Sequence, residues 1–142
     1  MADALSVIPA SVLRNLSDKL YEKRKNAALE VEGIVKQLAS SGDHEKISAV
    51  INLLTTEFTY SPQANHRKGG LIGLAAATVG LTSEAAQHLE VVRGDFIIFF
   101  NQIFDALCKL SADSDANVQS AAHLLDRLVK DIVTESDQFR FV

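Results

Sequence analysis

Two stretches that lie 43 residues apart decide the fold: RKNAALEVEGIVKQL at residues 24–38 and RKGGLIGLAAATVGL at residues 67–81. Each begins with an Arg-Lys pair and then spaces its apolar side chains as an α-helix does, so that Val31 aligns with Leu74. Residues 118–132 repeat the apolar pattern at an offset of 94 from the first stretch. The chain is therefore built from internal repeats, each with a long amphipathic helix.

Another stretch with helical apolar periodicity precedes the long helix in each of the two later repeats, at residues 47–58 and 96–110. No segment alternates with period two for long enough to form a half-buried strand. Turn-forming residues separate the helices at 40–43, 61–65 and 111–115. The pattern predicts an all-α fold, a short HEAT/armadillo-like solenoid of stacked helix pairs.

We expect the whole chain, residues 1–142, to form a single HEAT-repeat domain, with repeats at about 9–39, 43–81 and 95–135. The third repeat follows the second by 51 residues instead of 43. The surplus lies in residues 82–93, which we expect to form a helix without a partner. The first helix is expected to break near residues 17–19, and Asp43 is expected to cap the helix that follows it.

Composition excludes several classes of protein. Hydrophobic residues make up 47% of the chain, the net charge is −4, and there is one Cys. A single Cys excludes a disulfide framework, and mild acidity argues against a protein that binds nucleic acid through its overall charge. The longest apolar run, Phe96–Phe100, is too short for a bilayer, which needs about 20 residues. We expect a soluble protein of a reducing compartment, without a secretory signal.

Patterns of catalytic or metal-ligating residues are not found. The four histidines lie on different segments, and Gly69–Gly73 lacks the Gly-Lys-Ser/Thr ending of a phosphate-binding loop. These glycines are expected instead to let a helix pack closely against its neighbour. Cys108 is expected to be a small core residue, and Asp113 and Asp115 are expected to cap a helix. We therefore expect no enzyme, no cofactor and no metal.

Five basic side chains are the candidates for a partner contact, and they lie near the starts of two successive repeat helices: Lys23, Arg24, Lys25, Arg67 and Lys68. Stacked helices are about 10 Å apart, so these charges predict one basic stripe on a mainly acidic protein. They are either solvated helix starts balanced by nearby glutamates, or a contact surface for a protein or for anionic lipid. Residues 96–100 likewise form either a buried helix start or an exposed apolar patch.

Three stretches carry a resemblance to a known family: DKLYEKRKNAALE at residues 18–30, RKGGLIGLAA at 67–76 and LLDRLVKDIVTES at 124–136. They resemble the N-terminal HEAT repeats of the vacuole-segregation (VAC) scaffold family of the PIKfyve-type phosphoinositide kinase complex. In that family a further helix pair separates the segments that meet here at Glu90 and Val91, and a long C-terminal part follows. The resemblance therefore implies a shortened form, such as a splice variant, with one helix pair missing and the C-terminal part absent.

The resemblance also implies a non-enzymatic scaffold or regulatory subunit of the complex that controls phosphatidylinositol 3,5-bisphosphate synthesis. The implied partner is the lipid kinase, whereas the family binds its lipid phosphatase through C-terminal regions absent here. It implies peripheral association with the cytoplasmic face of endosomal or vacuolar membranes, a cytosolic pool and no nucleic acid. The alternative is a peripheral membrane-binding helical module that uses the basic stripe and residues 96–100. An enzyme, and a chain that does not fold stably, are more distant alternatives.

Overall fold

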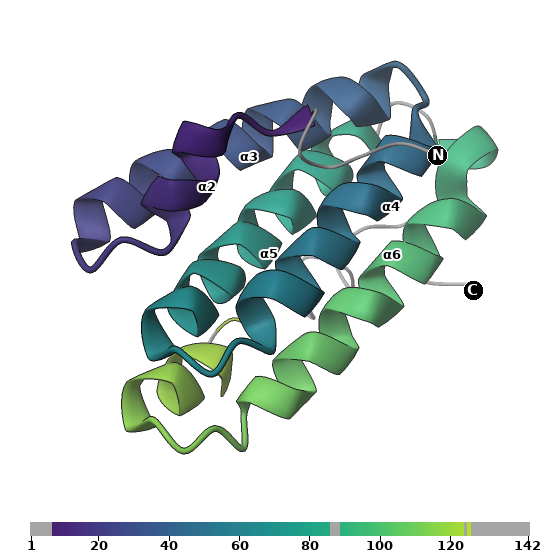
Figure 1. The fold of residues 1–142 in the computed structure, drawn as a ribbon. Helices are drawn as coiled ribbons and strands as arrows, with labels where there is room; N and C mark the ends of the chain where they lie inside the picture. The colour runs from purple at the N-terminus through teal and green to yellow at the C-terminus, as the bar shows by residue number, and fades with distance from the viewer. Residues whose placement is uncertain (1–6, 86–88, 124, 126–142) are drawn as a thin grey trace.

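A computed structural model of the chain describes residues 7–85, 89–123 and 125. All regular structure in these ranges is helical, which confirms the all-α prediction (Figure 1). The helices are α2 (Ala10–Leu16), α3 (Tyr21–Ser40), α4 (His44–Leu53), the π-helix η1 (Leu54–Thr59), α5 (Ala64–Ala85) and α6 (Leu89–Leu110). Another helix begins after α6, over residues 116–123.

The helices pack as antiparallel pairs that stack side by side. In Figure 1, α3 lies beside α5, and α4 lies beside α6 on the near side of them. The most extensive packing joins α3 to α5, whose buried side chains repeat the aligned apolar positions: both Val31 and Leu74 are fully buried. This arrangement is a helical repeat fold, in which each pair buries its apolar faces against its neighbours.

Local chemistry sets the first helix ends. Helix α2 stops at Leu16, and α3 starts only at Tyr21, so the predicted break is confirmed. After α3, Gly42 takes a left-handed backbone conformation with φ of 71°, which glycine adopts at little cost. The side chain of Asp43 then accepts the backbone N–H of Lys46 at 3.2 Å, which confirms it as the cap of α4.

The glycines of α5 bring it unusually close to its neighbours. A Cβ atom on Gly69 would collide with the backbone carbonyl of Leu16, and one on Gly70 would lie 2.9 Å from the backbone nitrogen of Thr59. Farther along, a Cβ on Gly80 would lie 2.9 Å from the carbonyl oxygen of Glu32. The close packing predicted for this glycine-rich start is confirmed, and it extends along the helix to α3.

Three features differ from the sequence-based expectations. Residues 82–85 end α5 and Leu89 begins α6, so the structure divides the stretch 82–93 between two long helices and does not show a separate helix there. Cys108 is exposed, because it lies about 100° around the helix from the buried Leu107. The segment after α4 widens into η1, where the Thr59 hydroxyl donates to the Leu54 carbonyl oxygen at 3.0 Å.

Of the apolar run at residues 96–100, the described side chain of Phe99 is buried, and its four neighbours lie outside the described side chains. None of the helices in the described ranges is long and apolar enough to cross a membrane.

Candidate functional site

All five candidate basic residues lie at the same end of the stack, where α3 and α5 begin (lower left in Figure 1). Their surroundings differ sharply. Lys23 and Lys25 are exposed, and Lys23 makes only a loose ion pair with Asp18 at 3.9 Å. Lys68 is half-buried, and both arginines are drawn into the protein. The stripe is therefore a set of separate environments and not a continuous exposed surface.

Arg67 joins the start of α5 to the turn that follows α6. Its Nε donates to Oδ2 of Asp113 at 2.7 Å, and its Nη2 donates to Oδ1 of the same carboxylate at 3.1 Å. Its Nη1 also donates to the carbonyl oxygen of Ser61 at 3.0 Å. The Arg67 and Asp113 side chains are only 14% and 7% exposed. This bidentate ion pair is largely buried within the chain, so Asp113 already neutralises the charge of Arg67.

Arg24 occupies the equivalent position at the start of α3 and makes the equivalent backbone contact. Its Nη1 donates to the carbonyl oxygen of Asp18 at 2.7 Å, and its guanidinium lies 5.9 Å from the ring centre of Tyr21. Unlike Arg67, it pairs with no carboxylate among the described residues, and its buried Nε has no hydrogen-bond partner there. A buried cation without a counter-charge is unusual in a stable core.

Arg24 and Lys68 meet at a cavity of about 460 Å³, which we call the basic groove. Three helices line it: Tyr21 and Arg24 come from α3, Lys68, Leu71 and Ile72 from α5, and Asn117, Ala121 and Leu125 from the last helix. The described lining residues combine two cations with an apolar floor, and none of them carries a carboxylate. The structure thus brings two of the five candidates together at one hollow.

Asp113 and Asp115 lie in the turn before the last helix, at this same end of the stack. Asp115 accepts the backbone N–H groups of Asn117 at 2.9 Å and Val118 at 3.1 Å, which confirms it as a helix cap. The hydrogen bond from Val118 is the main cause that lowers the pKa of Asp115, with help from Asn117, Lys68 and Arg67, while desolvation opposes them. Asp113 instead pairs with Arg67, a contact that the sequence analysis missed because 46 residues separate the two.

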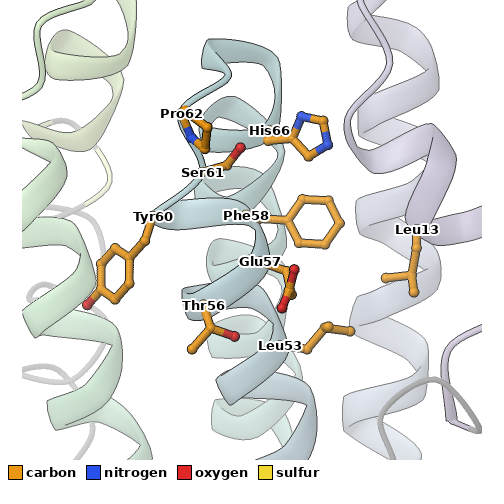
Figure 2. A pocket seen from close by; sticks show the side chains of 9 residues that line it. All are labelled: Leu13, Leu53, Thr56, Glu57, Phe58, Tyr60, Ser61, Pro62 and His66. Carbon is orange, nitrogen blue, oxygen red and sulfur yellow. The ribbon is translucent and has the colours of Figure 1, made fainter.

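A second hollow of about 660 Å³ lies between α2 and η1 and was not expected from the sequence (Figure 2). Phe58 and His66 form its upper part, with ring centres 5.8 Å apart, and Leu13 closes it from α2. Glu57, Tyr60 and His66 are the titratable residues among those described in its lining, and no described hydrogen bond or ion pair joins them. Over the described residues, no three His, Cys, Asp or Glu side chains gather as metal ligands. We find no catalytic arrangement in this hollow.

The chain is similar in sequence to one protein family and to several curated proteins. Residues 88–131 match the family described as "Vacuolar 14 Fab1-binding region". "Protein VAC14 homolog" of Arabidopsis thaliana is 70% identical over 169 residues, which cover 98% of this chain and 23% of that protein. "Vacuole morphology and inheritance protein 14" of Saccharomyces cerevisiae is 38% identical over 157 residues, covering 88% of this chain and 18% of that protein. No solved structure matches the chain.

The alignment with the Arabidopsis protein is longer than the chain itself, 169 against 142 residues, so that relative has residues for which this chain has none. This agrees with the helix pair that the resemblance implied to be missing. The chain spans less than a quarter of the length of these curated relatives. Over nearly its whole length, it is related to the vacuole-segregation family of VAC14 proteins, as its three diagnostic stretches indicated.

Proposed function

We propose that the chain is a protein-binding module of a regulatory scaffold for a phosphoinositide kinase of the Fab1/PIKfyve type. The observation that carries this proposal is the match of residues 88–131 to a Fab1-binding region. That region includes Asn117, Ala121 and Leu125, which form one wall of the basic groove. The matched segment therefore contributes directly to a surface that combines cationic and apolar side chains.

In this proposal the chain is non-enzymatic and supports phosphatidylinositol 3,5-bisphosphate synthesis by holding the kinase. Its described acids and bases support that view, because Asp43 and Asp115 cap helices and Asp113 pairs with Arg67. The name of the yeast relative supports a place at the vacuole, and we propose peripheral association with the cytoplasmic face of endosomal or vacuolar membranes. We assign no contact with a lipid phosphatase to this chain.

Among the five candidate residues, we assign the solvent-facing part of the partner contact to Lys23 and Lys25, which are exposed, and to Lys68, which is half-buried. Arg24 and Arg67 also have a structural role, because each ties its helix start to a backbone carbonyl. Replacing either arginine is expected to disturb the fold as well as binding. A clean test of the contact therefore uses the lysines.

The test is capture of a Fab1/PIKfyve-type kinase by the purified 142-residue chain. The wild-type chain is expected to retain the kinase, and the Lys23→Glu/Lys25→Glu/Lys68→Glu variant is expected to retain at least about tenfold less. Lys46→Glu on α4 is the matched control, because Lys46 pairs with Asp43 outside the stripe. Failure of the wild-type chain to capture kinase contradicts the function, whereas full capture by the triple variant contradicts only the lysine assignment.

A peripheral membrane-binding module is the second candidate. It is favoured by the exposed apolar side chains of Leu20, Tyr21 and Leu29, which are 54%, 57% and 55% exposed beside the lysines of α3. Such interleaving of apolar and basic groups suits an anionic membrane surface. Flotation with anionic vesicles tests it: the triple lysine variant should lose flotation, and equal flotation with neutral vesicles would remove the electrostatic part.

A further inference from the structure

We propose that the basic groove binds a short acidic-apolar segment of a partner protein. A carboxylate of that segment pairs with Arg24 and Lys68, and a neighbouring apolar side chain lies on Leu71 and Ile72. This inference rests on the proposed role of the chain as a binding module, and it specifies the chemistry that the module recognises.

The first reason is the missing acid beside Arg24. Arg24 and Arg67 hold the same repeat position and both donate from Nη1 to a carbonyl oxygen six residues earlier. Arg67 also has Asp113, whose Oδ1 accepts the backbone N–H two residues later; in the preceding turn the residue that makes this same hydrogen bond is Ser61, which carries no charge. Arg24 is 9% exposed, its Nε has no described partner, and it lines an open groove. A carboxylate from outside the chain supplies the charge that the repeat leaves out.

The second reason is that a second cation, Lys68, and an apolar floor lie in the same groove as Arg24. Lys68 lines the same groove and makes no ion pair with any described residue. Leu71 is 1% exposed, and Ile72 is partly buried against the core, so the floor of the groove is apolar and continuous with the core. A hollow of about 460 Å³ falls within the usual range of ligand sites, roughly 300–1,000 Å³.

The shape of the site favours a peptide over a membrane. The two cations lie in a groove walled on both sides by helices, at Tyr21 of α3 and at Ala121 of the last helix. A flat bilayer surface meets the exposed lysines of α3 more readily than it meets such a floor. The chain also has a net charge of −4, which opposes close approach of the whole molecule to an anionic membrane.

The nearby acid does not fill this role. The charge of Lys68 helps to lower the pKa of Asp115, but the Asp115 carboxylate is held by the backbone N–H groups of Asn117 and Val118. It does not line the groove. The groove therefore remains cationic while Asp115 is ionised.

The test uses fluorescence anisotropy with the full 142-residue chain and a panel of labelled peptides. The panel places a Glu-Glu pair before or after Leu and Phe in a Gly-Ser background, and a matched panel has Gln-Gln in place of Glu-Glu. We expect the glutamate peptides to bind, with at least about tenfold weaker binding of the glutamine peptides and weaker binding at high salt. Anionic vesicles form a separate arm.

Two variants keep the fold while they change the groove. Lys68→Ala removes one cation, and Asn117→Asp places a carboxylate in the groove at an exposed position in the first turn of the last helix, where an acid suits the helix dipole. Each is expected to weaken peptide binding by about tenfold. Lys46→Ala, outside the groove, is the control and should bind as the wild type does.

The outcomes separate the two proposals. Binding of no glutamate peptide, equal binding by the groove variants, or binding of anionic vesicles alone overturns the peptide inference. If the chain still captures kinase in any of these cases, the proposed function stands without the groove. If it captures neither peptide nor kinase, both fail. Competition between the glutamate peptides and the kinase supports both together.

Discussion

Arg24 at the start of α3 and Arg67 at the start of α5 hold the same repeat position, yet their side chains end in different surroundings. Each donates from Nη1 to the carbonyl oxygen six residues before it. Arg67 then grips Asp113 through two further hydrogen bonds, whereas Arg24 faces the basic groove without a described carboxylate partner. Arg67 therefore joins two repeats through an ion pair, whereas Arg24 at the other junction keeps a cation that is available to a partner.

The difference arises in the turn residue that the next repeat supplies. Asp18, Ser61 and Asp113 each use a side-chain oxygen to accept the backbone N–H two residues later, at 2.8, 3.1 and 2.8 Å. Serine preserves this turn as well as aspartate does, because a hydroxyl oxygen is also an acceptor. It brings no negative charge, however, and so cannot neutralise the preceding arginine.

The largest expected effect comes from breaking the closed junction. Asp113→Ala leaves the charge of Arg67 nearly buried and unpaired, and it should lower the free energy of unfolding by about 3 kcal/mol. Urea denaturation of the 142-residue chain measures this. In an Arg67→Met background the same change should cost far less, because no charge is left behind. Lys46→Ala, at an exposed ion pair, should change stability by under about 1 kcal/mol. Equal losses in the two backgrounds would show that the pair is not coupled.

The second comparison of α3 with α5 concerns their glycines. Gly69→Ala should lower the free energy of unfolding by about 2 kcal/mol. The added Cβ would collide with the backbone carbonyl of Leu16, so α5 and the end of α2 must move apart. Gly33→Ala on α3 is the matched control, since a Cβ there meets nothing within 4 Å. It should raise stability by roughly 0.5–1 kcal/mol through helix propensity. Urea midpoints that shift in the same direction for both variants would contradict the close-packing argument.

Local chemistry made much of this fold predictable from the sequence. The break after Leu16 and the caps at Asp43 and Asp115 depend on a few adjacent residues, and all three are confirmed. The repeat alignment predicted the long helices, because buried positions such as Val31 and Leu74 recur at the same spacing. Short capping and turn motifs, together with the recurrence of the apolar pattern along the chain, were therefore sufficient for these elements.

The candidate site was less predictable, because its properties depend on contacts between distant parts of the chain. The clustering of basic residues identified Arg67 as a candidate contact residue. It gave no sign that the Arg67 guanidinium forms an ion pair with Asp113, 46 residues away in the sequence. The apolar pattern around Cys108 similarly predicted a core residue, whereas packing selects Leu107 and leaves the thiol exposed. The hollow beside Phe58 depends on η1, whose wider turn has no simple sequence signature.

A smaller effect should follow from supplying the missing acid to the open junction. Ser61→Asp keeps the acceptor for the Gln63 N–H and adds a carboxylate at the position that matches Asp113. If the repeats are equivalent, it pairs with Arg24 and raises the free energy of unfolding by about 1 kcal/mol. Thermal unfolding by circular dichroism measures this, with Ser61→Asn as the uncharged control. A loss of stability relative to Ser61→Asn would show that the two junctions differ in more than this one charge.

The smallest effect concerns pH and the capping acid beside the basic groove. The hydrogen bond from Val118, joined by that from Asn117 and by the charges of Lys68 and Arg67, holds the pKa of Asp115 below its ordinary value. A depressed folded-state pKa means that the stabilisation is present above the unfolded pKa, about 3.9, and is lost as pH falls through the folded value. The stability difference between the wild type and Asp115→Asn should therefore be constant from neutral pH to about 5 and shrink below about 4. Urea midpoints across this range measure it, and a difference that grows on acidification would assign the cap's contribution to a group other than Asp115.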